Sequence, residues 1–195
     1  LTELFREYGT TIHAMTIDDE PDIARRGFSL DCSRGKVPTL ATLFSLIEHL
    51  GHWKINELQL YVENVFQFAR HPRIGQGYSP FSRADIVAIE EQCRLHHITF
   101  VPSLTSLGHF EKILMLPEYS DLGELPGYSD LPGGTTLNPV DPRSIDLVRD
   151  LYEEYLPLFA AEDFNACGDE PWELGKGRSS ERAKAIGEGR VYLDF

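Results

Sequence analysis

The strongest constraint on the fold of this chain is an alternation of short apolar segments with longer stretches of helical period. Strand-like runs are centred near residues 30, 59, 100 and 166, and helical stretches separate them. These runs are residues 27–32, 57–62, 98–102 and 164–168. Because strands joined through helices pair in parallel, the order predicts a parallel α/β sheet built from βα units. No repeat of fixed period accompanies it, which disfavours a solenoid.

The helical stretches carry recognisable start signals. Thr39 is a candidate N-cap for the first of them, and Ser82 with Asp85 nearly matches a capping box for the second. Asp141–Pro142 opens the third, because proline suits the first helical turn. Apolar residues of the first stretch fall at i, i+3, i+4, i+7 and i+10, one face of a helix: Leu40, Leu43, Phe44, Ile47 and Leu50.

Each predicted strand runs into polar residues at its carboxyl end. The first ends at Asp31, the second reaches Glu63, the third leads to His109, and the fourth gives Asp169–Glu170. In a parallel sheet these ends meet at one edge, where the active sites of such folds are built. The sequence therefore predicts carboxylates and an imidazole on one rim.

The Asp169–Glu170 pair suggests acid–base chemistry. Adjacent residues of a strand point to opposite faces, so both carboxylates can share a pocket only if the backbone turns, as Gly168 and Pro171 allow. Repulsion and burial would then keep one carboxyl protonated as a general acid and the other ionised. That division suits glycosidic cleavage, with Trp172 as an apolar wall or a sugar-stacking surface.

Charge and composition exclude several classes of function. The net charge is −13, with 31 acidic against 18 basic residues, and no basic stripe offsets it, which disfavours nucleic-acid binding. No apolar run approaches the roughly 20 residues that cross a bilayer, so no membrane partner is expected. No signal peptide is visible, but the sequence begins at Leu1 rather than Met, so localisation stays open, with the cytoplasm only weakly favoured. Three widely spaced cysteines form no CxxC pair and are expected as buried free thiols: Cys32, Cys93 and Cys167.

Four motifs together resemble glycoside hydrolase family 20, the β-N-acetylhexosaminidases. They are Arg26–Asp31 with Ser33–Arg34 following, Leu58–Glu63, Leu107–His109 and Gly168–Glu170. The motifs occur in the family's order and extend from about residue 20 to the end of the chain. Two departures concern the Cys167–Gly168 step, which is often a glycine doublet, and the Tyr61–Asn64 segment, which is usually richer in His and Asp.

The resemblance implies an activity and a set of roles. Glu170 would be the general acid/base, and Asp169 would orient the substrate's own 2-acetamido group, which attacks the anomeric carbon to form an oxazolinium-like intermediate with retention. Arg26 would grip hydroxyls of the terminal sugar, and His109 and Glu63 would support the acid/base and the pocket wall. The substrate would be an N-acetylhexosamine-containing oligosaccharide or glycoconjugate, with no metal or other cofactor.

The same resemblance implies a (β/α)8 TIM-barrel type of fold, which usually needs about 250 residues. With 195 residues, and Leu1 rather than Met at its start, the chain is expected to hold about the first four βα units. Residues 1–20 would be a lead-in segment, and residues 21–195 the first half of the catalytic barrel, truncated at the C-terminus. Residues 104–140 would form an insert on the active-site face and residues 175–189 a mobile loop, with another element beginning near 191–193. Open sheet edges would favour a homo-oligomer.

Two other classes of function remain open from the sequence. One is a metal-dependent barrel hydrolase with Asp31, His109 and Asp169 as ligands, although the chain has no HExxH motif and no His-x-His on the first strand. The other is a carbohydrate-binding or interaction module without catalysis. Activity that survives a chelator, or sugar binding without turnover, would separate them.

Overall fold

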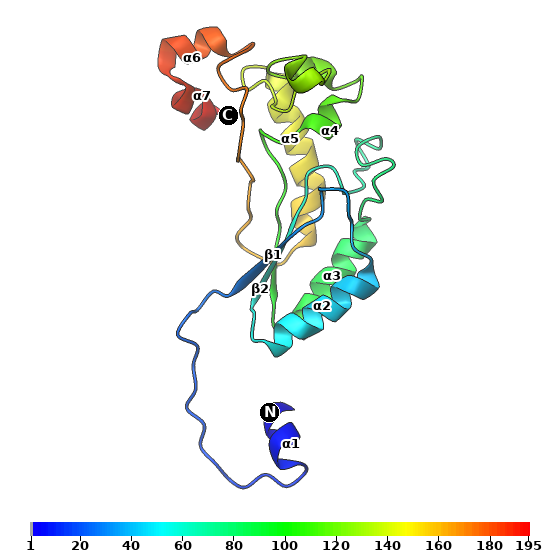
Figure 1. The fold of residues 1–195 in the computed structure, drawn as a ribbon, viewed down its shortest axis with the longest axis vertical. Helices are drawn as coiled ribbons and strands as arrows, with labels where there is room; N and C mark the ends of the chain where they lie inside the picture. The colour runs from blue at the N-terminus through cyan, green and yellow to red at the C-terminus, as the bar shows by residue number, and fades with distance from the viewer. Residues whose placement is uncertain (1) are drawn as a thin grey trace.

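A parallel three-stranded sheet forms the centre of the computed structural model, which describes residues 2–195 (Figure 1). The strand order is β1-β2-β3, with Gly27 opposite Glu57 and Glu57 opposite Thr99. The strands are β1 (Gly27–Asp31), β2 (Glu57–Tyr61) and β3 (Thr99–Val101). The predicted parallel α/β arrangement of the first three strands is therefore confirmed.

Two helices connect these strands and lie side by side in Figure 1: α2 (Leu40–His52) and α3 (Arg83–Leu95). Both begin where the sequence predicts. The Thr39 hydroxyl accepts a hydrogen bond from the Thr42 amide at 3.3 Å, and Ser82 and Asp85 form a reciprocal capping box. Because these caps satisfy amides that the first helical turn leaves free, they fix where each helix starts.

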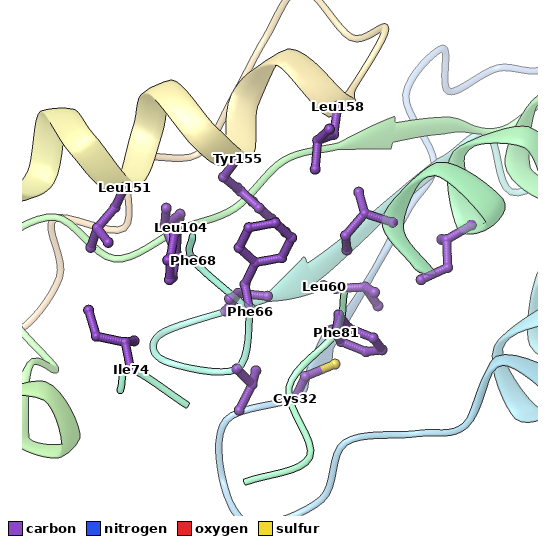
Figure 2. Close-up of a cluster of buried hydrophobic side chains, with 14 of the residues drawn as sticks. Cys32, Leu60, Phe66, Phe68, Ile74, Phe81, Leu104, Leu151, Tyr155 and Leu158 are labelled. Carbon is purple, nitrogen blue, oxygen red and sulfur yellow. The ribbon is translucent and has the colours of Figure 1, made fainter. Parts of the chain in front are cut away.

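A third long helix, α5 (Pro142–Tyr155), completes the core and runs into η3 (Leu156–Leu158). Figure 2 shows Tyr155 pointing from α5 toward Phe66, with 5.0 Å between the ring centroids and a tilt of 67°. Such edge-to-face pairs contribute about 0.5–1.5 kcal/mol beyond the area they bury. The predicted inner faces of α2, α3 and the sheet are buried in the same cluster, as are Cys32 and Cys93. All three cysteines are buried free thiols, as predicted.

The prediction of a fourth strand at residues 164–168 is wrong. Residues 164–168 pair with the segment that follows β3, at one position only, where Asn165 bridges to Ser103. The Asn165 amide donates to the Pro102 carbonyl and the Asn165 carbonyl accepts from Leu104. The ladder stops there because Pro102 has no amide hydrogen to donate and the Cys167 amide bonds instead to the Asn165 side chain at 3.0 Å. The Asn165 side chain thus accepts the Cys167 amide hydrogen bond that would otherwise extend the strand pairing.

The insert after β3 lies at the carboxyl edge of the sheet and contains short helices. They are α4 (Glu111–Leu114), η1 (Ser120–Leu122) and η2 (Tyr128–Asp130). Two buried carboxylates tie it to the C-terminal segment. Glu173 accepts hydrogen bonds from Thr135 and Thr136, and Glu124 accepts from the amide and hydroxyl of Ser179. The insert is therefore an ordered part of the fold.

The C-terminal segment also differs from the prediction. Residues 175–189 are not a plain loop, because α6 (Ser180–Ile186) forms within them. The element expected near 191–193 is a helix, α7 (Glu188–Asp194). Leu174, Ala183 and Val191 pack as a small separate cluster, which is what gives these short helices a face to bury.

The lead-in segment stands apart from the sheet in Figure 1. It contains α1 (Thr2–Tyr8), followed by residues without regular structure up to β1. Arg6 of α1 lies 3.3 Å from the ring nitrogens of His52. None of the helices within residues 2–195 is long and apolar enough to cross a bilayer.

Candidate active site

Four of the predicted site residues meet at the carboxyl edge of the sheet, three of them around the imidazole of the fourth, His109. His109 Nε2 lies 3.3 Å from Asp169 Oδ2 and 3.4 Å from Glu170 Oε2. On the other side of the ring, His109 Nδ1 lies 3.8 Å from Glu63 Oε1. The structure therefore brings Asp169, Glu170, His109 and Glu63 together at the edge where the sequence predicts them.

The backbone turns at the carboxylate pair, as predicted. Cys167 and Glu170 have φ angles of 45° and 49°, in the left-handed region that side chains rarely adopt, and His109 has a φ of 58°. These turns place both carboxylates on the His109 side. Gly108 makes the approach possible, because a Cβ atom there would lie 2.3 Å from the Asp169 carbonyl oxygen.

Two tyrosines hold the segment that carries the pair. The Tyr192 hydroxyl of α7 donates to the Gly168 carbonyl at 2.8 Å, and the Tyr152 hydroxyl of α5 is 3.3 Å from the Ala166 carbonyl. Each bond satisfies a carbonyl that the interrupted strand would otherwise have paired. The carboxylates therefore project from a segment supported by two helices.

Glu63 is the most buried member of the cluster. Its side chain is 1% exposed and its carboxylate is paired with Arg34, while Lys112 Nζ lies 3.5 Å from Oε2. The Glu63 backbone amide donates a hydrogen bond to the Ser33 hydroxyl at 2.9 Å, which fixes the backbone at this position. Burial raises the pKa of Glu63 above its ordinary value, and the hydrogen bond from Arg34 opposes that rise. Glu63 is thus a buried carboxylate that lies next to His109, on the side of the ring away from Asp169 and Glu170.

Asp169 and Glu170 are less enclosed than the sequence argument assumed. Their side chains are 49% and 53% exposed. Trp172 is also exposed, and its amide donates to the Glu170 carbonyl at 2.7 Å, which closes the turn. The Trp172 side chain is therefore exposed to solvent rather than packed as a wall of an enclosed pocket.

Arg26 does not lie in this cluster. It precedes β1, at the end of the strand opposite Asp31, about 16 Å away at roughly 3.3 Å per residue. Its guanidinium donates to the carbonyls of Ile23, Ala24 and Lys54, so the side chain fastens the entry to the sheet. The structure therefore does not bring Arg26 to the carboxylates.

The ligand set considered for a metal is only partly assembled. Asp31 accepts a hydrogen bond from the Ser33 amide at 2.7 Å and caps the end of β1. A different trio, Glu63, His109 and Glu111, offers ligand atoms within 4.8 Å of one another. Arg34 and Lys112 already neutralise Glu63 in this arrangement. A cation would have to displace them, which weakens the metal interpretation.

Three contributing residues were not assigned from the sequence. Arg34 stands in a motif of the resemblance, but residue order does not show that its partner is Glu63, at the end of the neighbouring strand. Lys112 comes from the insert, where no periodicity marks it. Tyr192 follows a glycine- and charge-rich stretch, so only the fold reveals that α7 returns to the segment that carries Asp169 and Glu170.

Comparison with curated proteins identifies hexosaminidases, although no protein-family model matches the sequence. The chain is 27% identical to β-hexosaminidase subunit A1 of Dictyostelium discoideum over 173 residues, which cover 84% of this chain and 32% of that protein. It is 26% identical to hexosaminidase D of Bos taurus over 148 residues, covering 75% and 40% of the two chains. The match thus covers between 32% and 40% of the length of these relatives.

Solved structures share the fold. A chitobiase from Flavobacterium johnsoniae superposes with a TM-score of 0.75 at 21% identity, covering 89% of this chain and 29% of the chitobiase. The GH20 β-N-acetylhexosaminidase from Streptomyces coelicolor gives a TM-score of 0.68 at 22% identity, covering 91% and 38%. Sequence relatives and fold agree, and they confirm that this chain resembles glycoside hydrolase family 20 and is β-N-acetylhexosaminidase-like over most of its length.

Proposed function

We propose that the protein carrying this chain removes terminal β-linked N-acetylhexosamine from glycans or glycoconjugates. The observation that carries the proposal is the placement of His109 Nε2 within 3.4 Å of both Asp169 and Glu170 at the carboxyl edge of a parallel sheet. Its curated relatives are hexosaminidases, which supports the same chemistry here.

In the proposed reaction, Glu170 is the general acid/base. It protonates the glycosidic oxygen as the bond from that oxygen to the anomeric carbon breaks, and the acetamido oxygen of the substrate forms a bond to the same carbon. Water then attacks the oxazolinium intermediate, Glu170 accepts its proton, and the sugar leaves with retained configuration. Asp169 orients the acetamido group and stabilises the positive charge that develops on it. Trp172 offers a stacking surface for the sugar.

We further propose that residues 21–195 are the first part of a (β/α)8 barrel. The parallel order of β1, β2 and β3 and the position of the cluster at their carboxyl ends support this. The match to between 32% and 40% of the length of these curated relatives also supports it. The pocket around the acetamido group would then need further residues outside this segment.

The test of Glu170 compares leaving groups in the natural protein that carries this sequence. Glu170→Gln should remove most activity on substrates with poor leaving groups, because those need protonation. It should spare aryl glycosides with good leaving groups, because those need little. Glu162→Gln, at an exposed carboxylate outside the cluster, is the matched control and should leave both rates unchanged. Equal loss on both substrate classes in Glu170→Gln would count against the acid role.

Two further arms of the assay separate the rival functions. Activity that disappears with a chelator and returns with a divalent cation would favour a metal-dependent hydrolase. Binding of an N-acetylhexosamine oligosaccharide with no turnover in the natural protein would favour a carbohydrate-binding module. Turnover in the presence of the chelator is the result that the proposed function predicts.

A further inference from the structure

Arg34 occupies an unusual place, because its guanidinium reaches two members of the cluster at once. Nη1 pairs with Glu63 Oε1, and Nη2 lies 3.3 Å from Nδ1 of His109 with hydrogen-bonding geometry. Arg34 follows β1, Glu63 follows β2 and His109 lies beyond β3. One side chain thus connects the ends of three neighbouring strands.

The direction of the bond between Arg34 and His109 is fixed by chemistry. A guanidinium has five N–H donors and no acceptor, and it stays protonated at any pH that a folded protein survives. His109 Nδ1 must therefore accept this bond, which it can do only when it carries no hydrogen. A neutral imidazole with a bare Nδ1 has its hydrogen on Nε2. The Arg34 contact thus selects one tautomer of His109.

The selected tautomer carries its hydrogen on the ring nitrogen nearest the carboxylate pair. Nε2 is the ring atom that lies 3.3 Å from Asp169 and 3.4 Å from Glu170. An Nε2–H group there is a donor that either carboxylate can accept, and such bonds are often long until substrate binds. The ring orientation is further limited by Tyr61, whose ring meets that of His109 nearly edge-on at a centroid distance of 6.3 Å.

Glu63 is the group that could accept a hydrogen bond from an Nδ1–H of His109, and Arg34 occupies the same carboxylate. Its Oε1 lies 3.8 Å from His109 Nδ1, close enough for a small ring movement to create an Nδ1–H to carboxylate bond. Arg34 pairs with that same oxygen, and Lys112 approaches the other one at 3.5 Å. With both oxygens engaged, Glu63 has less to offer an Nδ1–H group. Glu63 therefore holds Arg34 in place through their ion pair, while Lys112 engages the other carboxylate oxygen.

We propose that Arg34 is a positioning residue that sets the tautomer of His109, so that the ring hydrogen lies on Nε2, the nitrogen nearest Asp169 and Glu170. Its catalytic consequence rests on the proposed function, whereas the tautomer is a property of the folded chain itself. Lysine cannot replace arginine here. One ammonium can pair with Glu63 but lacks the planar fork that reaches Glu63 and His109 together.

The direct test is nitrogen-15 NMR of histidine side chains in the 195-residue chain near neutral pH. The His109 signal is assigned as the one that disappears in His109→Gln. We expect the wild-type chain to show an acceptor-type Nδ1 and a protonated Nε2 at His109. Arg34→Lys should shift His109 toward the Nδ1–H form, facing Glu63, while backbone spectra stay those of a folded protein. Arg94→Lys, which alters an exposed pair with Glu91, is the matched control and should leave His109 unchanged.

Two spectroscopic results would overturn the proposal. One is a wild-type His109 with hydrogen on Nδ1, alone or on both nitrogens, which needs no variant to be observed. The other is a folded Arg34→Lys chain in which His109 keeps the wild-type pattern. Neither result depends on hydrolysis, so failure here is distinguishable from failure of the proposed function.

A kinetic readout in the natural protein completes the test. If Arg34 acts through His109, Arg34→Lys should lower kcat on aryl N-acetyl-β-glucosaminides about tenfold or more and leave KM nearly unchanged. That pattern marks loss of a transition-state interaction without loss of ground-state binding. A raised KM with unchanged kcat would mean that Arg34 contacts the substrate directly, which contradicts a positioning role.

Discussion

At the scale of single residues, the cluster contains one buried carboxylate, that of Glu63 at the end of β2. Glu63 is almost fully buried, yet it is flanked by Arg34 and Lys112, so its charge is compensated locally. Removing one partner of such a buried group usually costs more than the pair contributes, because the remaining charge is left unpaired. The support behind His109 therefore depends on all three side chains.

Burial of Glu63 predicts a particular pH dependence of stability. Its pKa is raised above 4.5 in the folded chain, so the unfolded chain releases this proton at lower pH than the folded chain does. Between 4.5 and the raised folded value, stability contributed by Glu63 should fall as pH rises, with a slope of at most about 1.4 kcal/mol per pH unit. Glu63→Gln, which cannot ionise, should lack this slope.

The measurement is urea unfolding of both chains across that pH window, scored as the difference between their free energies of unfolding. Other titrating groups are shared by the two chains and cancel in the difference. A difference that is flat with pH, or one that favours the wild type increasingly as pH rises, would show that Glu63 is not destabilised by burial.

At this scale, the sequence predicts which polar residues come together when the prediction rests on their position after a predicted strand. Glu63 follows β2, His109 lies beyond β3, and Asp169 and Glu170 follow residues 164–168, which the sequence predicts as a strand. Parallel strands end at one edge, so these positions along the chain indicate a common site. Arg26 was assigned through the resemblance alone, and the structure places it at the other end of its strand, bonded to backbone carbonyls. A long side chain can turn either way along a strand, which residue order does not specify.

At the scale of elements, the helix starts were predictable because caps are local. Ser82 and Asp85 are three residues apart, and their mutual hydrogen bonds need nothing from the rest of the fold. The failure of the fourth strand was not predictable, because it depends on which residues of the segment after β3, Pro102 among them, lie beside residues 164–168. The helix within residues 175–189 was missed because its small cluster forms only when α6 meets α7.

The capping box of α3 gives a test of this local account. Ser82→Ala removes the acceptor for the Asp85 amide and should lower the free energy of unfolding by about 1 kcal/mol. Ser45→Ala, at an exposed position inside α2, is the matched control and should be neutral or slightly stabilising, because alanine favours helix interiors. Urea denaturation of both variants measures this. Equal effects would mean that the cap does not stabilise α3.

At the scale of the whole molecule, the sheet is open at β1. That strand pairs with β2 on one side, and Ser29 and Asp31 along it are exposed. Exposed edges of parallel sheets are templates for pairing with another chain. The described surface also carries large exposed apolar side chains, among them Phe28, Phe164 and Leu193. These features favour association of the isolated segment.

We therefore expect the purified 195-residue chain to scatter light as a dimer or larger species rather than at 22.1 kDa. Ser29→Lys adds a charge to the open strand, a device by which natural edges resist pairing, and should shift the chain toward the monomer. A wild-type chain that remains monomeric at all concentrations would contradict association through this edge.

The most direct measurement of the central claim compares two substrates with the same aryl leaving group in the natural protein that carries this sequence. One is a β-N-acetylglucosaminide and the other a plain β-glucoside. Because the acetamido group would be the nucleophile, the first should be cleaved and the second hardly at all, and Asp169→Asn should slow the first markedly. Comparable rates on both substrates, unaffected by Asp169→Asn, would point to a nucleophile from the protein and contradict acetamido participation at the Asp169–Glu170 pair.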